Sequence, residues 1–220
     1  MSIKSNIKKL LNSVPSEVKV VAVSKFHSTD EIMEAYDEGQ RIFGESRVQE
    51  LVQKNEVLPK DIEWHFIGGL QRNKVKQIAP FISLIHSVDS VRLMREIEKQ
   101  AVANNRTISC LLQIHVAEED TKAGFTPDEC LKFMSDGIWK ECTHVKFKGI
   151  MGMATFTDDA NKVRSEFQEL RQLFDKVKSD YFANDSNFKE ISMGMTGDYP
   201  TAIEEGSTMI RVGTLIFGER

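Results

Sequence analysis

Residues 18–31 read VKVVAVSKFHSTDE and connect an apolar, β-branched run to a helix start within a few residues. A run of this kind is typical of a buried strand. Ser28 is followed three residues later by Glu31, which is a capping box, the usual beginning of a helix. The segment therefore predicts a strand, a short loop and a helix, the repeating unit of a parallel α/β fold.

Lys25 lies where this strand ends and the loop begins. Partial desolvation at such a position favours the neutral amine, which is the form that attacks an aldehyde. The alternative is a surface lysine whose stem covers apolar surface while its charge stays in water. Lys25 is thus a candidate nucleophile, and the rest of the chain has to decide between the two interpretations.

The same alternation continues along all 220 residues. Strands are expected at 18–23, 41–43, 63–67, 83–86, 108–115, 145–150, 189–192 and 209–212. Helices are expected at 2–13, 29–38, 46–56, 72–79, 90–104, 127–136, 160–182 and 198–205. Eight strands separated by helices predict one (β/α)₈ TIM barrel domain over residues 1–220, preceded by an extra N-terminal helix. An open doubly wound sheet is the structural alternative. Because the chain ends soon after the eighth strand, at most a stub of the last helix is expected.

Composition excludes several classes of function. The net charge is −4, and the densest basic cluster, Arg72, Lys74 and Lys76, fits a solvated helix face, so no nucleic-acid partner is expected. No apolar run is long enough to span a membrane, and the N-terminus lacks a signal sequence. The chain has 3 cysteines without metal-ligand spacing, which argues against a disulfide framework and a metal site. We expect a cytoplasmic monomer without a metal.

Polar and glycine-rich segments follow the predicted strands, where functional residues of a parallel barrel gather. The last two of these segments, 192–197 and 211–214, offer glycine for close backbone approach and the hydroxyls of Ser192, Thr196 and Thr214. Barrels often hold a phosphate at the loops after strands seven and eight. Ordinary tight turns are the alternative, but the occurrence of both loops together favours a phosphate site.

A phosphate site facing a nucleophilic lysine predicts a phosphorylated aldehyde held as a Schiff base. Pyridoxal 5′-phosphate (PLP) fits this description, with one end anchored by its phosphate and the other by Lys25. A class I aldolase acting on a sugar phosphate would use the same two elements, so both interpretations remain open at this stage.

The sequence also resembles the YggS/PROSC family of pyridoxal phosphate homeostasis proteins, whose fold is that of the N-terminal barrel of alanine racemase. The resemblance covers nearly the whole chain and is carried by VAVSK (21–25), FGESRVQE (43–50), WHFIGGLQRNK (64–74), TKAG (121–124), GIMGM (149–153), SMGMTGD (192–198) and GSTMIRVGTLIFG (206–218).

This resemblance implies that Lys25 carries PLP and that the protein acts in vitamin B6 homeostasis, with apo-forms of PLP-dependent enzymes as possible recipients. It implies cofactor contacts from the two final loops, and Arg211 as the partner of the pyridine nitrogen. The implied cofactor-binding residues are Lys25, Ser192, Met195, Thr196, Arg211, Gly213 and Thr214. Ser46 departs from the family pattern, which has asparagine there, and a direct cofactor contact from that loop is therefore in doubt.

The resemblance leaves an amino-acid racemase as the alternative function. Racemisation needs a second acid/base group on the opposite cofactor face, and in the racemase relatives a C-terminal β-domain supplies it. This sequence lacks such a domain, so we expect a PLP carrier without turnover. If turnover occurs, the candidates for the second base are His65, His86 and His115.

Several other residues have a structural and a functional interpretation. His65 is expected to be a packed core histidine, whereas His86 and His115 end strands and could face the pocket. Asn73 and Lys74 could approach the cofactor, although a helix N-terminus explains Asn73 equally well. Four methionines are expected at the barrel mouth, more as packing than as a cofactor site: Met151, Met153, Met193 and Met195. The carboxylates Glu118, Glu119 and Asp120 are expected in a solvated loop.

Overall fold

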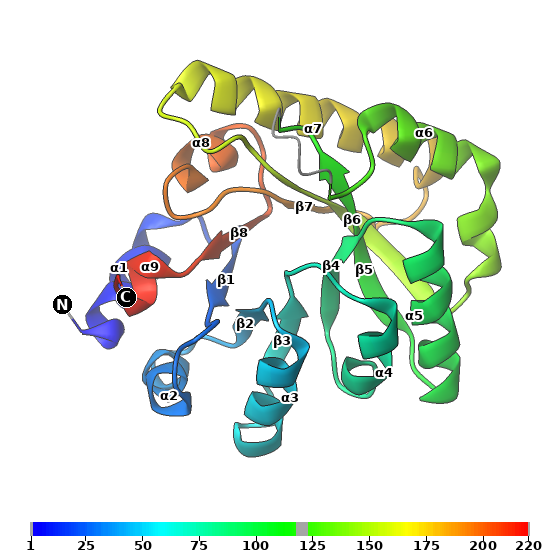
Figure 1. The fold of residues 1–220 in the computed structure, drawn as a ribbon. Coiled ribbons are helices and arrows are strands. Elements are labelled where there is room, and N and C mark those ends of the chain that lie inside the picture. The colour runs from blue at the N-terminus through cyan, green and yellow to red at the C-terminus, as the bar shows by residue number, and fades with distance from the viewer. Residues whose placement is uncertain (1, 118–122, 220) are drawn as a thin grey trace.

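The computed structural model describes residues 2–117 and 123–219. Within them, eight parallel strands close into a barrel in chain order, and the last strand pairs with the first (Figure 1). The strands are β1 (Lys19–Val23), β2 (Ile42–Glu45), β3 (Glu63–Phe66), β4 (Leu84–Val88), β5 (Ile108–His115), β6 (Val145–Met153), β7 (Glu190–Ser192) and β8 (Met209–Val212). The predicted TIM barrel is confirmed, and the open-sheet alternative is wrong.

Helices surround the barrel (Figure 1). They are α1 (Ile3–Ser13), α2 (Thr29–Asp37), α3 (Val48–Val57), the 3₁₀ turn η1 (Arg72–Lys74), α4 (Val75–Ile78), α5 (Val91–Ala103), α6 (Pro127–Asp136), η2 (Ile138–Glu141), α7 (Ala160–Tyr181), α8 (Tyr199–Glu204) and α9 (Thr214–Phe217). α9 is the expected stub. It lies beside α1, where the side-chain amide of Asn6 donates to the carbonyl of Ile216 at 3.1 Å.

Helix starts follow the expected caps. Ser28 and Glu31 form a reciprocal capping box at α2, and Thr126 and Glu129 form another at α6. The largest difference from the expected bounds is at β6, which runs on to Met153 although the sequence pattern stops at residue 150. Glycines weaken the strand signal there, but the whole of β5 pairs with this segment and holds it extended.

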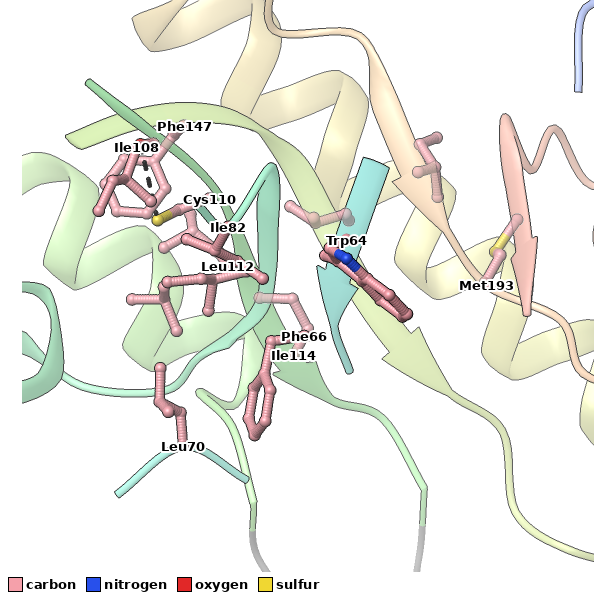
Figure 2. Close-up of a cluster of buried hydrophobic side chains, with 14 of the residues drawn as sticks. Trp64, Phe66, Leu70, Ile82, Ile108, Cys110, Leu112, Ile114, Phe147 and Met193 are labelled. Carbon is pink, nitrogen blue, oxygen red and sulfur yellow. Dashed lines mark hydrogen bonds between the residues drawn. The ribbon is translucent and has the colours of Figure 1, made fainter. Parts of the chain in front are cut away.

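The two faces of each strand pack in different places. On β5 the even-numbered residues Ile108, Cys110, Leu112 and Ile114 belong to the core between sheet and helices, together with Trp64 and Phe66 of β3 (Figure 2). The odd-numbered face of β5 points into the barrel, where Leu111 lies in a separate buried cluster. This second cluster consists of Val21, Leu84, Leu111, Met151 and Met209.

The close approach of β7 to β6 requires a glycine at one position of β6. Gly149 has φ +152°, and a Cβ added to it would lie 1.7 Å from the carbonyl oxygen of Glu190 on β7. Only glycine therefore permits the pairing of β6 with β7 at this point. No helix in the described part of the chain combines the length and apolarity needed to cross a bilayer.

Candidate functional site

A cavity of about 640 Å³ opens at the carboxyl ends of the strands. Its walls come from the segments after β1, β2, β3, β6, β7 and β8, which are far apart in sequence. Six of the seven predicted site residues line it: Lys25, Met195, Thr196, Arg211, Gly213 and Thr214. Ser46 lines it as well, from the loop after β2. Barrel closure thus brings the candidate nucleophile and both predicted phosphate loops to one cavity.

Thr196 and Thr214 connect the two candidate phosphate loops. The hydroxyl of Thr214 donates to that of Thr196 at 3.0 Å. Among the described residues, the backbone N–H groups of Thr196, Gly197 and Thr214 meet no protein acceptor. The N–H of Met195, by contrast, donates to the carboxylate of Asp198 at 2.5 Å. The two loops therefore offer adjacent hydroxyls and N–H donors to an anion, as a phosphate requires.

Arg211 supplies the buried positive charge of the cavity. Its Nη1 donates to the carbonyl and the hydroxyl of Ser192, at 2.8 and 2.6 Å, and its Nη2 donates to the carbonyl of Gly152 at 3.0 Å. Burial lowers the pKa of Arg211 to about 10, against the opposing effect of Asp198, so the guanidinium stays protonated at neutral pH. In the described part of the protein, these bonds leave Nε and one Nη2 hydrogen of Arg211 without an acceptor.

Ser192 lies beneath the cavity instead of lining it. The residue is fully buried, and its hydroxyl meets Arg211 on one side and Nδ1 of His86, at 3.1 Å, on the other. Ser192 is therefore placed to hold Arg211. The residue is not among those that line the cavity, and the contact of its side chain with a phosphate stays a prediction.

The three histidines considered as a second base all lie away from the cavity walls. His65 is the packed core histidine that the sequence predicts, and its Nδ1 lies 3.0 Å from Nε2 of His86 inside the barrel. Burial lowers the pKa of His65 to about 3 and holds that of His86 well below its ordinary value, so both rings are neutral. His115 is half-buried at the end of β5.

Four methionines were expected at the barrel mouth, and the structure places two of them there. Met153 and Met195 line the cavity, but Met151 lies in the cluster inside the barrel and Met193 in the outer core. Met151 lies on β6 and Met193 directly follows β7, and both side chains are buried. Asn73 lies within η1 and caps neither η1 nor α4, whose N-caps are Gln71 and Lys74. Neither Asn73 nor Lys74 lines the cavity.

Two segments considered in the sequence analysis lie outside the described residues, namely the expected solvated loop of Glu118, Glu119 and Asp120 and the Thr121-Lys122 half of the TKAG segment. In the described ranges, no group of three His, Cys, Asp or Glu side chains is arranged to hold a metal ion. The three cysteines are buried thiols.

The loop from β6 to α7 is a wall of the cavity that the sequence analysis missed. Thr155 anchors it, because its N–H and its hydroxyl each donate to the carboxylate of Glu166 at 2.6 Å. Phe156, which is 96% exposed, and Thr157 continue the wall. The available signal was position alone, since these residues follow the sixth predicted strand. His27 was missed too; it lines the cavity and stacks on Phe217 of α9 with centroids 4.4 Å apart.

Comparison with known proteins agrees with this geometry. The family model described as "Alanine racemase, N-terminal domain" matches residues 1–220. The pyridoxal phosphate homeostasis protein of Aquifex aeolicus is 39% identical over 203 residues, covering 92% of this chain and 87% of the relative. That of Helicobacter pylori is 38% identical over 204 residues, covering 92% and 88%.

A solved structure is similar over the same extent. PipY of Synechococcus elongatus, with PLP bound, superposes with a TM-score of 0.88 at 33% identity, covering 99% of this chain and 100% of PipY. Fold, motifs and identity over nearly the full length agree. This chain belongs to the family of the pyridoxal phosphate homeostasis proteins, which share the alanine racemase N-terminal fold.

Proposed function

We propose that this protein binds PLP in the cavity at the carboxyl ends of the strands and acts in PLP homeostasis. One observation carries the proposal: a single cavity is lined by Lys25, by the hydrogen-bonded pair Thr196 and Thr214, and by the buried guanidinium of Arg211. A relative of the same family has been solved with PLP bound, which supports the assignment.

The donor set fits the chemical groups of PLP. Hydroxyl and N–H donors of the two final loops suit the phosphate, and the remaining N–H groups of Arg211 suit a pyridine nitrogen, since a guanidinium only donates. When bound, PLP supplies an aldehyde carbon that amines attack. Lys25 would hold this carbon through its amine, and the carbonyl oxygen would leave as water. Ser192 acts through Arg211 in this arrangement.

We propose further that bound PLP is passed on to other proteins. We propose apo-forms of PLP-dependent enzymes as the recipients, and a cytoplasmic monomer whose residues 1–220 make one PLP-binding domain. Incubation of the PLP-loaded protein with apo-enzymes tests the transfer. Activation of the apo-enzyme should persist when a scavenger traps free PLP, and activation that the scavenger abolishes would contradict direct transfer.

The attachment point is tested by reduction with borohydride and peptide mapping. The pyridoxyl group should be found on Lys25, and a label on Lys74 or Lys122 would reject the assignment. Lys25→Ala should lose the absorbance of the imine and remain folded, because this half-buried side chain lines a cavity and is outside both buried clusters. It should keep weaker, non-covalent binding through the phosphate loops.

A further inference from the structure

Lys54 belongs to α3, one of the helices on the outside of the barrel. A lysine on such a helix usually extends into solvent, but Lys54 is buried. Its side chain is 7% exposed. The ammonium donates to the carbonyl of Ser24 at 2.7 Å, to Oε1 of Glu45 at 2.7 Å and to Oε1 of Glu50 at 2.6 Å. Three acceptors match the three N–H donors of an ammonium, so every donor of this buried group has a partner.

Glu45, Glu50 and Lys54 hold the two peptide units that flank Lys25. Before Lys25, the carbonyl of Ser24 accepts from Lys54, and the hydroxyl of Ser24 donates to Glu45 at 2.7 Å. After Lys25, the N–H of Phe26 donates to Glu50 at 2.5 Å. The direction in which the side chain of Lys25 leaves the backbone depends on these two peptide planes.

Two further details indicate that the arrangement is specific. Phe26 has φ +68°, a left-handed conformation that a bulky residue rarely adopts and that surrounding contacts must maintain. Glu50 lies three residues after Arg47, the N-cap of α3, which makes no side-chain capping bond. A glutamate at that position usually turns back to the N-cap, but Glu50 reaches across to the loop after β1 instead.

We propose that Glu45, Glu50 and Lys54 form a positioning network that orients Lys25 for attack on the aldehyde of PLP. The inference rests on the proposed PLP function. Catalytic and binding contacts remain with the cavity residues, because none of the three network members lines the cavity. The network acts on the backbone of Lys25 and fixes where its amine reaches.

The experiment compares Glu50→Ala, Glu50→Gln and a matched control, Glu56→Ala, which removes an exposed glutamate from the same helix. Three quantities are measured. The rate and the final yield of imine on Lys25 with PLP come from absorbance and borohydride labelling, and the third quantity is the affinity for pyridoxine 5′-phosphate. The second ligand keeps ring and phosphate but has no aldehyde, so its binding does not require Lys25 to be oriented.

Glu50→Ala should form the imine about tenfold more slowly or worse, because small misplacements of a reacting group are costly, while its affinity for pyridoxine 5′-phosphate stays within about twofold of wild type. Glu50→Gln keeps a side-chain oxygen to accept from Phe26 and should restore most of the rate. Glu56→Ala should match wild type. Lys54→Met, if it folds, should reproduce the defect of Glu50→Ala.

Imine formation by Glu50→Ala at the wild-type rate and yield would overturn the positioning role while leaving the PLP function intact. An equal loss of pyridoxine 5′-phosphate binding would also overturn it, because the network would then support the whole cavity and not Lys25. Absence of PLP binding by the wild-type protein would instead reject the proposed function itself.

Discussion

Nε2 of His86 lies 3.0 Å from Nδ1 of His65 inside the barrel, and the other nitrogen of His86 lies 3.1 Å from the hydroxyl of Ser192. Arg211 only donates, so this hydroxyl accepts from Arg211 and has its own proton available for Nδ1 of His86. His86 then carries its proton on Nε2 and donates to His65. A chain of neutral groups thus supports the cationic Arg211 without adding charge beside it.

This arrangement predicts a pH dependence of stability. The pKa of His65 is about 3 in the folded protein, below the ordinary value of about 6.5 in an unfolded chain. The unfolded state therefore binds more protons between these values, and the contribution of neutral His65 to stability, complete above about pH 6.5, is lost as pH falls towards 3. Between about pH 3 and pH 6.5, His65→Gln should reduce the slope of unfolding free energy against pH by about 1.4 kcal/mol per unit.

Denaturant unfolding of both proteins at a series of pH values measures this slope. Comparing slopes between wild type and variant cancels the carboxyl groups that titrate in the same range, including Glu45 and Asp198, whose pKa values are raised by burial. Identical slopes for the two proteins would show that His65 is not held neutral.

The pairing of Thr214 with Thr196 predicts a phosphate-dependent affinity. Hydrogen bonds to a charged group contribute about 1.5–3 kcal/mol each, so pyridoxal should bind at least about tenfold more weakly than PLP. Thr214→Val removes the hydroxyl that donates to Thr196 and should weaken PLP more than pyridoxal. Titrating wild type and Thr214→Val with each ligand compares the affinities for PLP and pyridoxal within the same protein. Equal affinities for PLP and pyridoxal would mean that the loops are only turns.

The close contact at Gly149 predicts that a substitution there strongly destabilises the protein, although the residue lies away from the cavity. Alanine there would place its Cβ against the carbonyl of Glu190, in a positive-φ conformation. Gly149→Ala should lower the unfolding free energy by about 3 kcal/mol or more. Gly69→Ala is the matched control, because a Cβ there meets nothing within 4 Å, and it should change stability by less than about 0.5 kcal/mol. Similar midpoints of thermal unfolding for the two variants would contradict this account of the β6–β7 contact.

The placement of the histidines predicts negligible racemase, transaminase or decarboxylase turnover. Racemisation needs an acid/base group on each face of the bound cofactor, and Lys25 serves one of them. His65, His86 and His115 are not among the residues that line the cavity. His27 does line it, but its ring stacks on Phe217 and its Nδ1 lies 3.1 Å from the carboxylate of Glu31. Incubation with L-amino acids in deuterated water, followed by measurement of Cα–H exchange and enantiomer ratio, tests this expectation. Multiple turnovers of D-amino acid, abolished by Lys25→Ala, would make the protein an enzyme.

Much of the site followed from position along the chain. Lys25, Thr196, Arg211 and Thr214 all come at or directly after the ends of predicted parallel strands, and such ends meet at one edge of a barrel. Predicting eight strands was therefore enough to bring these residues together. The loop after β6 was missed because its Thr-Phe-Thr sequence carries no signal other than that same position.

Other features depend on distances across the barrel that no local pattern contains. The sequence shows the strand order, the capping boxes and the residue at each strand end, because strand and helix periodicities and caps are local properties. Only the closed barrel decides that Ser192 lies under Arg211 and beside His86, and that Lys54 of α3 reaches the peptide before Lys25. These contacts join residues 19, 106 and 30 positions apart. Strand stagger and the packing of each helix on the sheet set them, and these exist only once the chain has closed on itself.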